Sequence, residues 1–485
     1  MGYHLVNVIL HALVTILYYH VAQAFVPHSQ KVARICSYLF AVHPIHTEAV
    51  TGVVGRAELL SSVFFLLAIL FYKKATFKGQ YVHLAISMAF VACAMLCKEQ
   101  GITVLAIVII YEVFMVQKLD LNHVKSYYYT NNNKSLSTWM KFIPCLSRIC
   151  IAICTGISLL IFRILIMGHT LPVFTNFDNP ASYAETPAKQ LTWAYLLPVN
   201  AWLLLAPAQL LCDWTMGTVP LVTTLADPRN LATLLLFVIL LHLSWVALTN
   251  NRALVMSLAL LGLPFLPASN LFFPVGFVVA ERVLYIPSMG FCLLMAQGFN
   301  TLLKLTSKKS ILWTIFTAII CLNGLKCLVR NQDWRTEESI FLSGLKVSTK
   351  NAKLWNNVGH ALETRKSYDE ALMFFQQATN VQPDDVGAHI NVGRTLNHLA
   401  KFEEAEKAYL KAKSLLPQPK PGQRYVTRIA PQHLSVFLNL GNLMAKDPAR
   451  LEEADGLYRQ AIAMRNDYVQ VSLLLIDLKH LMERK

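Results

Sequence analysis

The sequence has few charged residues: Asp, Glu, Lys and Arg make up 15% of its 485 residues, whereas hydrophobic types make up 55%. The mean hydropathy is +0.44. These values exclude an ordinary soluble globular protein and are typical of a chain that crosses a membrane several times. The sequence also lacks a disulfide framework or a zinc spacing, because all ten cysteines lie in or beside apolar segments before residue 330.

The formal net charge of +15 does not indicate nucleic-acid binding. From residue 330 onward, 22 basic residues oppose 18 acidic ones, so most of the excess lies in the apolar region before it. The basic residues of that region occur in short loops between hydrophobic runs rather than on one continuous face. They therefore predict membrane topology, and no nucleic-acid partner is expected.

Ten apolar runs are long enough, or nearly long enough, to span a bilayer. They lie near residues 4–25, 33–45, 57–72, 81–97, 101–117, 142–166, 231–248, 253–273, 283–303 and 311–329. An eleventh run, 191–211, contains Pro198 and Pro207. We interpret it as re-entrant or interfacial, and an ordinary span is the alternative.

With ten spans, most basic loop residues fall on one side, which the positive-inside rule makes cytosolic. The opposite side then contains the loops near 42–57, 167–230 and 274–282, together with the region 330–485. The segment from Phe40 to Leu59 lies there with two histidines, two glutamates and an arginine between apolar runs. Because ionisable groups are costly in such sequence, this segment is a candidate functional site.

The region 330–485 repeats small and large apolar residues with a period of 34 residues. The positions that keep this spacing are Trp355, Gly359, Ala371, Phe375, Ala378 and Pro383, then His389, Gly393, Ala405, Tyr409, Ala412 and Pro417, and, with one extra residue, Phe437, Gly441, Ala454, Tyr458 and Ala461. This spacing is that of the tetratricopeptide repeat (TPR), a helical hairpin. It predicts repeats at 352–385, 386–419 and 434–467, followed by a partial fourth.

Both regions resemble the transmembrane and tetratricopeptide-repeat-containing (TMTC) family, and most of all its third vertebrate paralogue. One matching motif is Cys-Lys-Glu-Gln-Gly-Ile-Thr at 97–103, and the other matching stretches are 3–9, 40–65, 171–180, 196–202, 212–218, 267–291 and 351–394. The resemblance implies an all-α, multi-pass membrane bundle of the GT-C glycosyltransferase type over residues 1–329, followed by a TPR solenoid in the lumen of the endoplasmic reticulum. The implied enzyme transfers mannose from dolichyl phosphate mannose to Ser or Thr of cadherin-like proteins.

We expect the sequence to be truncated at both ends. The predicted topology exports the N-terminus, yet the chain begins without a basic segment or a cleavable signal. The third repeat lacks its usual closing proline, and the remainder stays apolar-rich. GT-C enzymes use an acidic catalytic base in the first lumenal loop, which would precede Tyr3. The implied catalytic residue therefore lies upstream of Met1, and this chain alone is expected to lack full activity.

The implied chemistry calls for cations that bind the lipid phosphate. The few basic residues of the membrane region on the predicted lumenal side are Arg56, Lys98, Lys189, Arg229 and Arg282, and the candidates among them are Arg56, Lys98 and Arg282. Arginine is the better bidentate phosphate partner, so we favour Arg282, with helix capping as the alternative. Lys98 could instead form a local ion pair with Glu99, and Glu58 could pair with neighbouring helices.

The remaining candidates for donor or substrate binding are His43, His46, Glu48, Asp213 and Glu281. The two histidines could cap a helix, contact sugar or acceptor, or bind a metal. Their His-x-x-His-x-Glu spacing differs from the His-Glu-x-x-His zinc motif, so no metal site is predicted. Beyond the lipid-linked donor no cofactor is required, although the sequence leaves divalent-metal dependence open.

The repeats are predicted to bind proteins, such as acceptors or lumenal chaperones, because a solenoid presents a concave surface rather than a catalytic site. An alternative function follows from the same region. The chain could be a non-catalytic lumenal TPR adaptor in quality control, with the membrane region as an anchor. Ten spans with buried charges exceed what an anchor needs, which favours the enzyme.

Overall fold

The computed structural model describes residues 2–78, 80–119, 143–168, 174–416 and 431–464. Over these residues the chain is helical and has no strand, which confirms the predicted all-α class. The backbone forms two compact units, Met1–Thr215 with Val219–Arg335, and Met216–Thr218 with Thr336–Lys485. The sequence placed the boundary after residue 329, and helix α15 (Lys309–Asp333) extends the first unit past it.

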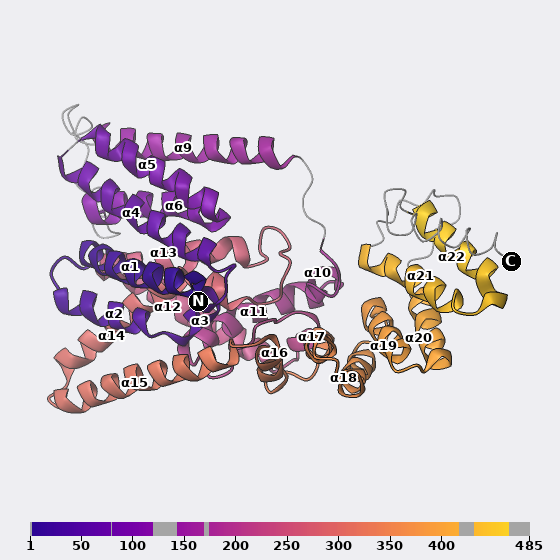
Figure 1. Ribbon diagram of the computed structural model, residues 1–485. Helices are drawn as coiled ribbons and strands as arrows, with labels where there is room; N and C mark the ends of the chain where they lie inside the picture. The colour runs from indigo at the N-terminus through magenta and orange to yellow at the C-terminus, as the bar shows by residue number, and fades with distance from the viewer. Residues whose placement is uncertain (1, 79, 120–142, 169–173, 417–430, 465–485) are drawn as a thin grey trace. The chain divides into compact units, whose positions relative to one another are not determined.

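The first unit is a bundle of long helices joined by short ones (Figure 1). Its longer helices are α1 (Gly2–Phe25), α4 (Arg56–Lys78), α5 (Tyr81–Cys97), α9 (Ile143–Met167), α11 (Ala188–Leu205), α12 (Arg229–Asn250), α14 (Pro287–Leu305) and α15, and α13 (Arg252–Gly262) is a shorter helix that continues into η5. Its shorter elements are α2 (Gln30–Ala41), η1 (Pro44–His46), α3 (Thr47–Thr51), η2 (Glu99–Thr103), α6 (Val104–Tyr111), η3 (Glu112–Val116), α10 (Pro180–Tyr183), η5 (Leu263–Ala268) and η6 (Glu281–Leu284).

Six helical segments among the described residues are long and apolar enough to cross a membrane. They are Gly2–Phe25, Arg56–Phe77, Glu99–Val116, Ile143–Ile166, Arg229–Thr249 and Lys309–Asp333. These six coincide with six of the ten predicted spans, and the predicted spans 81–97 and 253–273 overlap the shorter apolar helices Tyr81–Cys97 and Arg252–Ala268. The other two overlap α14 and α2, and α2 has only 12 residues, too few to cross a bilayer alone. Helix α11 ends at Leu205, before Pro207, and continues through Pro198.

Side chains at helix ends fix where several of these helices begin. The Ser29 hydroxyl accepts a hydrogen bond from the Val32 N–H and starts α2. Asn251 accepts one from the Leu254 N–H and separates α12 from α13. Both are N-caps, which satisfy backbone donors that the first helical turn leaves unpaired. Residues at these positions therefore turn one apolar run into two helices.

The core of the first unit lies where α1, α2, α4, α13 and α14 pack together. A methyl group at Gly290 of α14 would lie 2.2 Å from the Leu261 N atom of α13, so only glycine permits this close approach. The Tyr18 hydroxyl of α1 donates to the Met289 carbonyl at 2.5 Å. Small residues and interhelical hydrogen bonds commonly hold membrane helices together.

A buried ion pair joins α9 to η3. Glu112 accepts hydrogen bonds from Arg148 Nη2 at 2.6 Å and Nε at 3.1 Å, and a third from the Tyr72 hydroxyl at 3.1 Å. Neither charged residue is more than 8% exposed. A buried carboxylate needs such partners, because an unpaired charge is very costly away from water.

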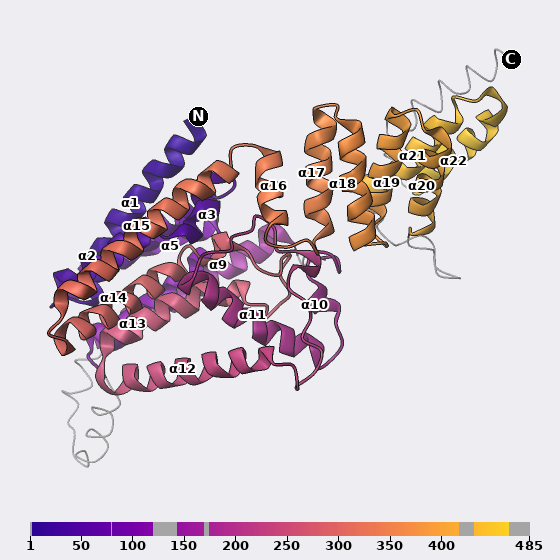
Figure 2. The same cartoon turned by 90° about the horizontal axis from the view of Figure 1, so that it is seen from below.

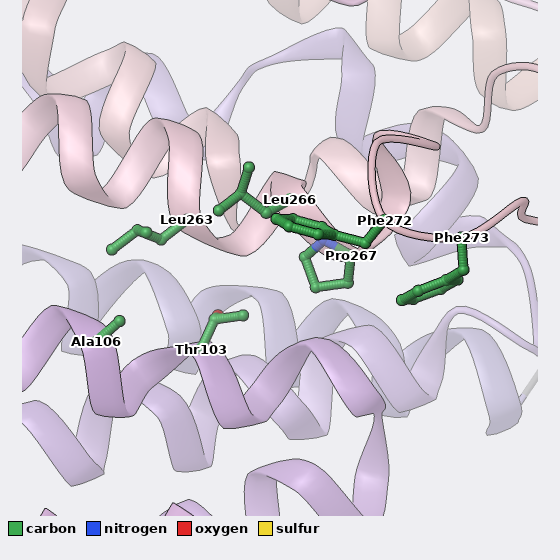
Figure 3. Close-up of a pocket in the computed structure, with 7 residues that line it drawn as sticks. All are labelled: Thr103, Ala106, Leu263, Leu266, Pro267, Phe272 and Phe273. Atoms are coloured by element: carbon green, nitrogen blue, oxygen red, sulfur yellow. The ribbon is translucent and has the colours of Figure 1, made fainter. Parts of the chain in front are cut away.

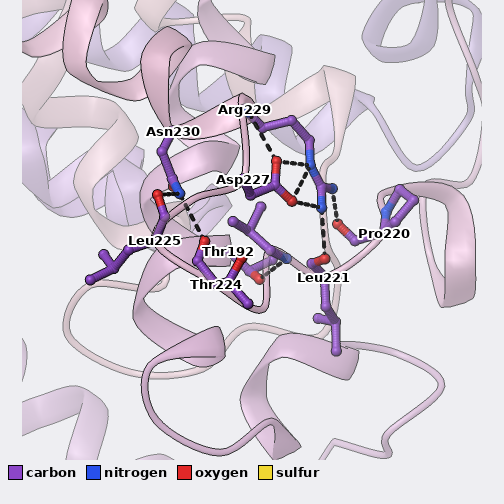
Figure 4. A network of polar contacts seen from close by, with 9 residues as sticks. Thr192, Pro220, Leu221, Thr224, Leu225, Asp227, Arg229 and Asn230 are labelled. Carbon is purple, nitrogen blue, oxygen red and sulfur yellow. Dashed lines mark hydrogen bonds and ion pairs between the residues drawn. The ribbon is translucent and has the colours of Figure 1, made fainter.

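The loop between α11 and α12 is held by a polar network (Figure 4). Arg229, the first residue of α12, binds both carboxylate oxygens of Asp227 and donates to the Pro220 and Leu221 carbonyls. Thr192 of α11 accepts a hydrogen bond from the Val222 N–H. These bonds satisfy backbone groups of a segment that has little regular structure.

The second unit consists of helix pairs (Figure 2). After α16 (Glu337–Leu345), the pairs are α17 (Ala352–Thr364) with α18 (Tyr368–Val381), α19 (Val386–His398) with α20 (Phe402–Ser414), and α21 (Pro431–Met444) with α22 (Leu451–Met464). The helix η7 (Pro448–Arg450) precedes α22, where the third repeat has its extra residue. The predicted partial fourth repeat and Pro417 lie outside the described residues.

Each pair is closed by a glycine that faces an aromatic ring. A Cβ atom at Gly359 would lie 2.6 Å from the Phe375 ring, and one at Gly393 would lie 2.6 Å from the Tyr409 ring. Gly441 and Tyr458 repeat this relationship at 2.5 Å. The spacing read from the sequence therefore corresponds to a physical contact, in which a small residue lets a large ring fill the helix crossing.

Candidate functional site

Glu48 and Arg282 form the centre of the candidate site in the first unit. Glu48 lies on α3, and its Oε2 accepts a hydrogen bond from the Arg282 backbone N–H in η6 at 3.0 Å. Its Oε1 faces the Arg282 Nη1 at 3.3 Å. The Glu48 side chain is 8% exposed and that of Arg282 is 40% exposed. Glu48 therefore orients a guanidinium group that remains accessible.

Glu281, the residue before Arg282, is almost fully buried. Its Oε1 accepts hydrogen bonds from the Leu211 N–H at 2.5 Å and the Trp214 Nε1–H at 3.2 Å. Burial and the nearby Glu48 charge raise the pKa of Glu281 to about 8, although the Arg330 charge opposes them. The two adjacent residues thus have different roles. Glu281 holds the loop that contains Leu211 and Trp214, whereas the Arg282 side chain remains partly exposed.

Arg330 belongs to the same cluster, a role that the sequence reading missed. It lies near the C-terminal end of α15, is 3% exposed, and forms an ion pair with Asp333 at 3.1 Å. Its charge acts on both Glu48 and Glu281. In the sequence analysis, residue 330 served only as the domain boundary. An arginine inside the last turn of an apolar helix is nevertheless itself a signal of buried charge.

Lys98 extends the cluster towards α5. It forms an ion pair with the buried Glu58 of α4, and its charge also acts on Glu48. Glu99 forms its ion pair with Arg163 of α9 at 2.5 Å. The suggested local pair between Lys98 and Glu99 is thus replaced by two pairs between helices, which fits the alternative that Glu58 binds a neighbouring helix.

The two histidines lie beside this cluster and are buried. His43 accepts a hydrogen bond from the Ile45 N–H at 3.3 Å through Nδ1, and its Nε2 lies 3.0 Å from the Leu204 carbonyl. The bond to a carbonyl requires a proton on Nε2, so both nitrogens are used and His43 acts as a cap. The Nε2 of His46 lies 2.8 Å from the Ser288 hydroxyl, and burial lowers the pKa of His46.

Arg56 and Asp213 have local structural contacts. Arg56 donates to the Asn7 side chain and the Tyr3 carbonyl, both at 3.0 Å, and so ties α4 to the start of α1. Asp213 accepts hydrogen bonds from the backbone N–H and the hydroxyl of Thr215, which forms a turn. Of the predicted residues, Glu48, Lys98, Glu281 and Arg282 are brought together, and Arg56 is held apart by α1.

An apolar groove lies between η2, the start of α6, and η5 (Figure 3). Its volume is about 220 Å³. It is lined by Thr103, Ala106, Leu263, Leu266, Pro267, Phe272 and Phe273. The groove-lining helix η5 contacts both η2, which begins directly after Lys98, and η6, which carries Arg282. An apolar groove on helices that adjoin the exposed Arg282 suits a molecule with a hydrocarbon chain and an anionic head.

The charged cluster combines carboxylates with guanidinium groups and the Lys98 ammonium group. Among the described residues, no group of three or more His, Cys, Asp and Glu side chains could hold a metal ion. The contacts instead place an arginine where it can bind an anion such as a phosphate.

The fold and the site define a polytopic membrane protein with a TPR array. The family described as "Protein O-mannosyl-transferase TMTC, DUF1736" matches residues 168–241, and the tetratricopeptide repeat family matches residues 352–385. The first match includes the network around Arg229. The chain belongs to the TMTC family, which confirms the resemblance inferred from its sequence.

Three curated relatives illustrate this similarity. Human protein O-mannosyl-transferase TMTC3 is 50% identical over 97% of this chain and 52% of its own length. The Drosophila melanogaster Tmtc3 protein is 49% identical over 97% of this chain and 56% of its own length. Mouse TMTC4 is 39% identical over 77% of this chain and 54% of its own. The chain thus spans about half the length of the curated relatives it matches.

Proposed function

We propose that this protein takes part in protein O-mannosylation as a dolichyl-phosphate-mannose-dependent mannosyltransferase of the endoplasmic-reticulum membrane. Its relatives are named protein O-mannosyl-transferases and match almost the whole chain. The proposed acceptors are Ser and Thr hydroxyls of secretory-pathway proteins with cadherin-like domains. The repeats are proposed to face the lumen. There they would contact acceptor proteins and lumenal chaperones.

The observation that carries this proposal is the guanidinium of Arg282, which Glu48 orients. Arg282 lies on η6, and η6 contacts η5, one of the helices that line the apolar groove. A polyprenyl phosphate sugar has a hydrocarbon chain, a phosphate and a polar head, and needs an apolar surface next to a cation. Among the described residues, the Arg282 side chain donates only to Glu48. Its other N–H donors remain for a phosphate oxygen, and the leaving phosphate is stabilised as negative charge develops on it.

Glu48 and Glu281 are positioning residues in this scheme. Glu48 is buried and holds both the backbone and the side chain of Arg282. Glu281 is buried and holds Leu211 and Trp214. Neither is assigned as the general base that removes the proton of the acceptor hydroxyl, because that base must contact the acceptor.

The repeats support the second half of the proposal, which is recognition of a protein acceptor. Neighbouring pairs are joined by polar contacts between α17 and α19: Arg394 binds both carboxylate oxygens of Glu363, and Asn391 donates to Asn356. A regular solenoid of this kind presents an extended surface rather than a reaction centre. We assign it to binding of protein rather than to transfer chemistry.

The test measures mannose transfer to a purified cadherin domain in membranes from cells that lack the endogenous enzymes. The variants are the unchanged 485-residue chain, a form extended at its N-terminus, and Arg282→Ala in the extended form. Arg335→Ala is the matched control, because Arg335 is exposed and has no ion pair among the described residues. We expect Arg282→Ala to lower transfer by about 100-fold, a typical loss for one charge-stabilising group, and Arg335→Ala to change it little.

The two parts of the proposal fail separately. If neither the unchanged chain nor the extended form transfers mannose above background, the transferase function is contradicted. The hypothesis of a non-catalytic TPR adaptor then remains. Equal transfer by Arg282→Ala and Arg335→Ala would contradict only the role of Arg282 in binding the phosphate.

A further inference from the structure

A second cavity lies at the other end of α4. It has a volume of about 660 Å³ and lies between the last turns of α1, the last three turns of α4, and the start of α5. Lys73 of α4 is 15 residues after Glu58, which corresponds to about 22 Å along the helix axis. This cavity is therefore separate from the cluster around Glu48 and Arg282.

The charged residues that line this cavity are two lysines, and its other polar lining residues are two histidines and Gln23. Lys73 and Lys74 come from α4, His20 from α1 and His83 from α5, and no carboxylate lines the cavity. Both lysines are exposed, and in the described part of the chain neither forms an ion pair. The Lys74 Nζ lies 4.8 Å from the centre of the Phe71 ring, a cation–π contact that holds it near the cavity wall. The cavity thus concentrates positive charge, and none of the described residues that line it is a carboxylate.

The remaining lining is apolar and continues to the end of α4. Leu67, Leu70 and Phe71 line the cavity, and Phe77 lies beyond them with 87% of its surface exposed. An exposed phenylalanine at the end of an apolar helix is favourable where the hydrocarbon of a bilayer meets its head groups. Lysine side chains near helix ends also extend to that level. The cavity therefore combines two lysines with an apolar wall, a composition that suits the level where lipid head groups meet hydrocarbon.

We propose that this cavity binds the head group of a phosphate-bearing anionic phospholipid from the adjacent leaflet. Lys73 and Lys74 would contact the phosphate, while the acyl chains lie along Leu67, Leu70 and Phe71. The sequence predicts this end of α4 to face the cytosol, where the leaflet is rich in anionic lipid. The occupant is distinct from the mannose donor, whose proposed site is at the opposite end of α4.

A lipid is favoured over a soluble anion because a soluble anion gains nothing from the apolar wall. A zwitterionic lipid would leave the two lysines without a matching charge. The inference does not depend on the proposed transferase function, because the cavity shares no residue with the groove or with the charged cluster.

The test uses the purified full chain in nanodiscs of phosphatidylcholine that contain a small fraction of fluorescent phosphatidylinositol 4-phosphate. Binding is measured for the unchanged chain, for Lys73→Gln with Lys74→Gln, and for Lys73→Arg with Lys74→Arg. The matched control is Lys308→Gln with Lys309→Gln, which removes two exposed lysines predicted to lie on the same side but outside the cavity. The arginine variant keeps the charge and checks that substitution itself is tolerated.

One lysine near a membrane surface contributes about fivefold to the affinity for an anionic lipid, so the Lys73 and Lys74 glutamine pair is expected to bind about 25-fold more weakly. The Lys308 and Lys309 pair is expected to bind as the unchanged chain does. Equal loss in both glutamine pairs would overturn the proposal in favour of general surface charge. Competition by inositol phosphate or inorganic phosphate as effective as that by the intact lipid would also overturn it, because the site would then bind a free anion.

Discussion

The carboxylate of Glu48 binds both the backbone N–H and the guanidinium of Arg282, although 234 residues separate them in the chain. One side chain thus fixes the position of η6 and the direction of its arginine. The fraction of Arg282 that remains exposed is what the proposed phosphate contact requires.

We predict that Glu48 and Arg282 are energetically coupled. A hydrogen bond to a charged group is worth about 1.5–3 kcal/mol when buried, and the exposure of Arg282 reduces this. In a double-mutant cycle of Glu48→Gln and Arg282→Gln, the coupling free energy is therefore expected to be about 1–2 kcal/mol. The measurement is thermal unfolding of the full chain in detergent. Strictly additive effects of the two substitutions would contradict a direct interaction.

Glu281 gives a prediction about pH. Its pKa in the folded protein is about 8, above the value of 4.5 for an exposed glutamate. Its contribution to stability is therefore greatest below pH 4.5 and is lost as the pH rises through about 8, because a buried carboxyl must then release its proton. Glu281→Gln keeps an oxygen acceptor for Leu211 and Trp214 but cannot ionise. The melting temperature of this variant, measured between pH 5 and 9, should fall less with rising pH than that of the unchanged chain. Parallel profiles would rule out Glu281 as the titrating group.

The sequence predicted the helical class, the TPR pairs and four residues of the charged cluster, because each depends on local spacing or on charge in apolar sequence. Gly359 and Phe375 could be paired from their 16-residue separation, which a helical hairpin makes a contact. The partners of Lys98 could not be predicted in this way. Glu58 and Lys98 come from different helices, and only the packing of α4 on α5 decides which carboxylate the lysine meets. Arg330 was missed although its place in the last turn of an apolar helix is a signal of buried charge; only its partners depend on packing.

The ion pair of Glu112 and Arg148 provides a prediction for the interior of the bundle. Arg148→Met removes the cation and leaves the Glu112 carboxylate buried without its main partner. Breaking a buried pair in this way typically costs about 3–5 kcal/mol. The double variant Glu112→Gln with Arg148→Met removes both charges and should regain most of that loss. The melting temperatures of both variants in detergent provide the measurement. A double variant no more stable than Arg148→Met would show that lost packing of the arginine, rather than the unpaired charge, destabilises the bundle.

The repeats offer two glycines whose replacement should act in opposite directions. A Cβ at Gly393 would lie 2.6 Å from the buried Tyr409 ring, whereas one at Gly456 of α22 would meet no atom within 4 Å. Both glycines lie in helices, so alanine gains about 0.5–1 kcal/mol of helix propensity at each. At Gly393 this gain is outweighed by overpacking, which costs about 1–3 kcal/mol.

Gly393→Ala is therefore expected to destabilise the second unit by about 1–2 kcal/mol, and Gly456→Ala to stabilise it by up to about 1 kcal/mol. Hydrogen exchange of the full chain, followed by mass spectrometry, reports the protection of α19 and α20 separately from that of the membrane helices. Faster exchange in these helices for Gly393→Ala, with unchanged or slower exchange in α22 for Gly456→Ala, is the expected result. A shift of the same sign in both variants would mean that helix propensity, rather than the contact between glycine and ring, determines the stability of the repeats.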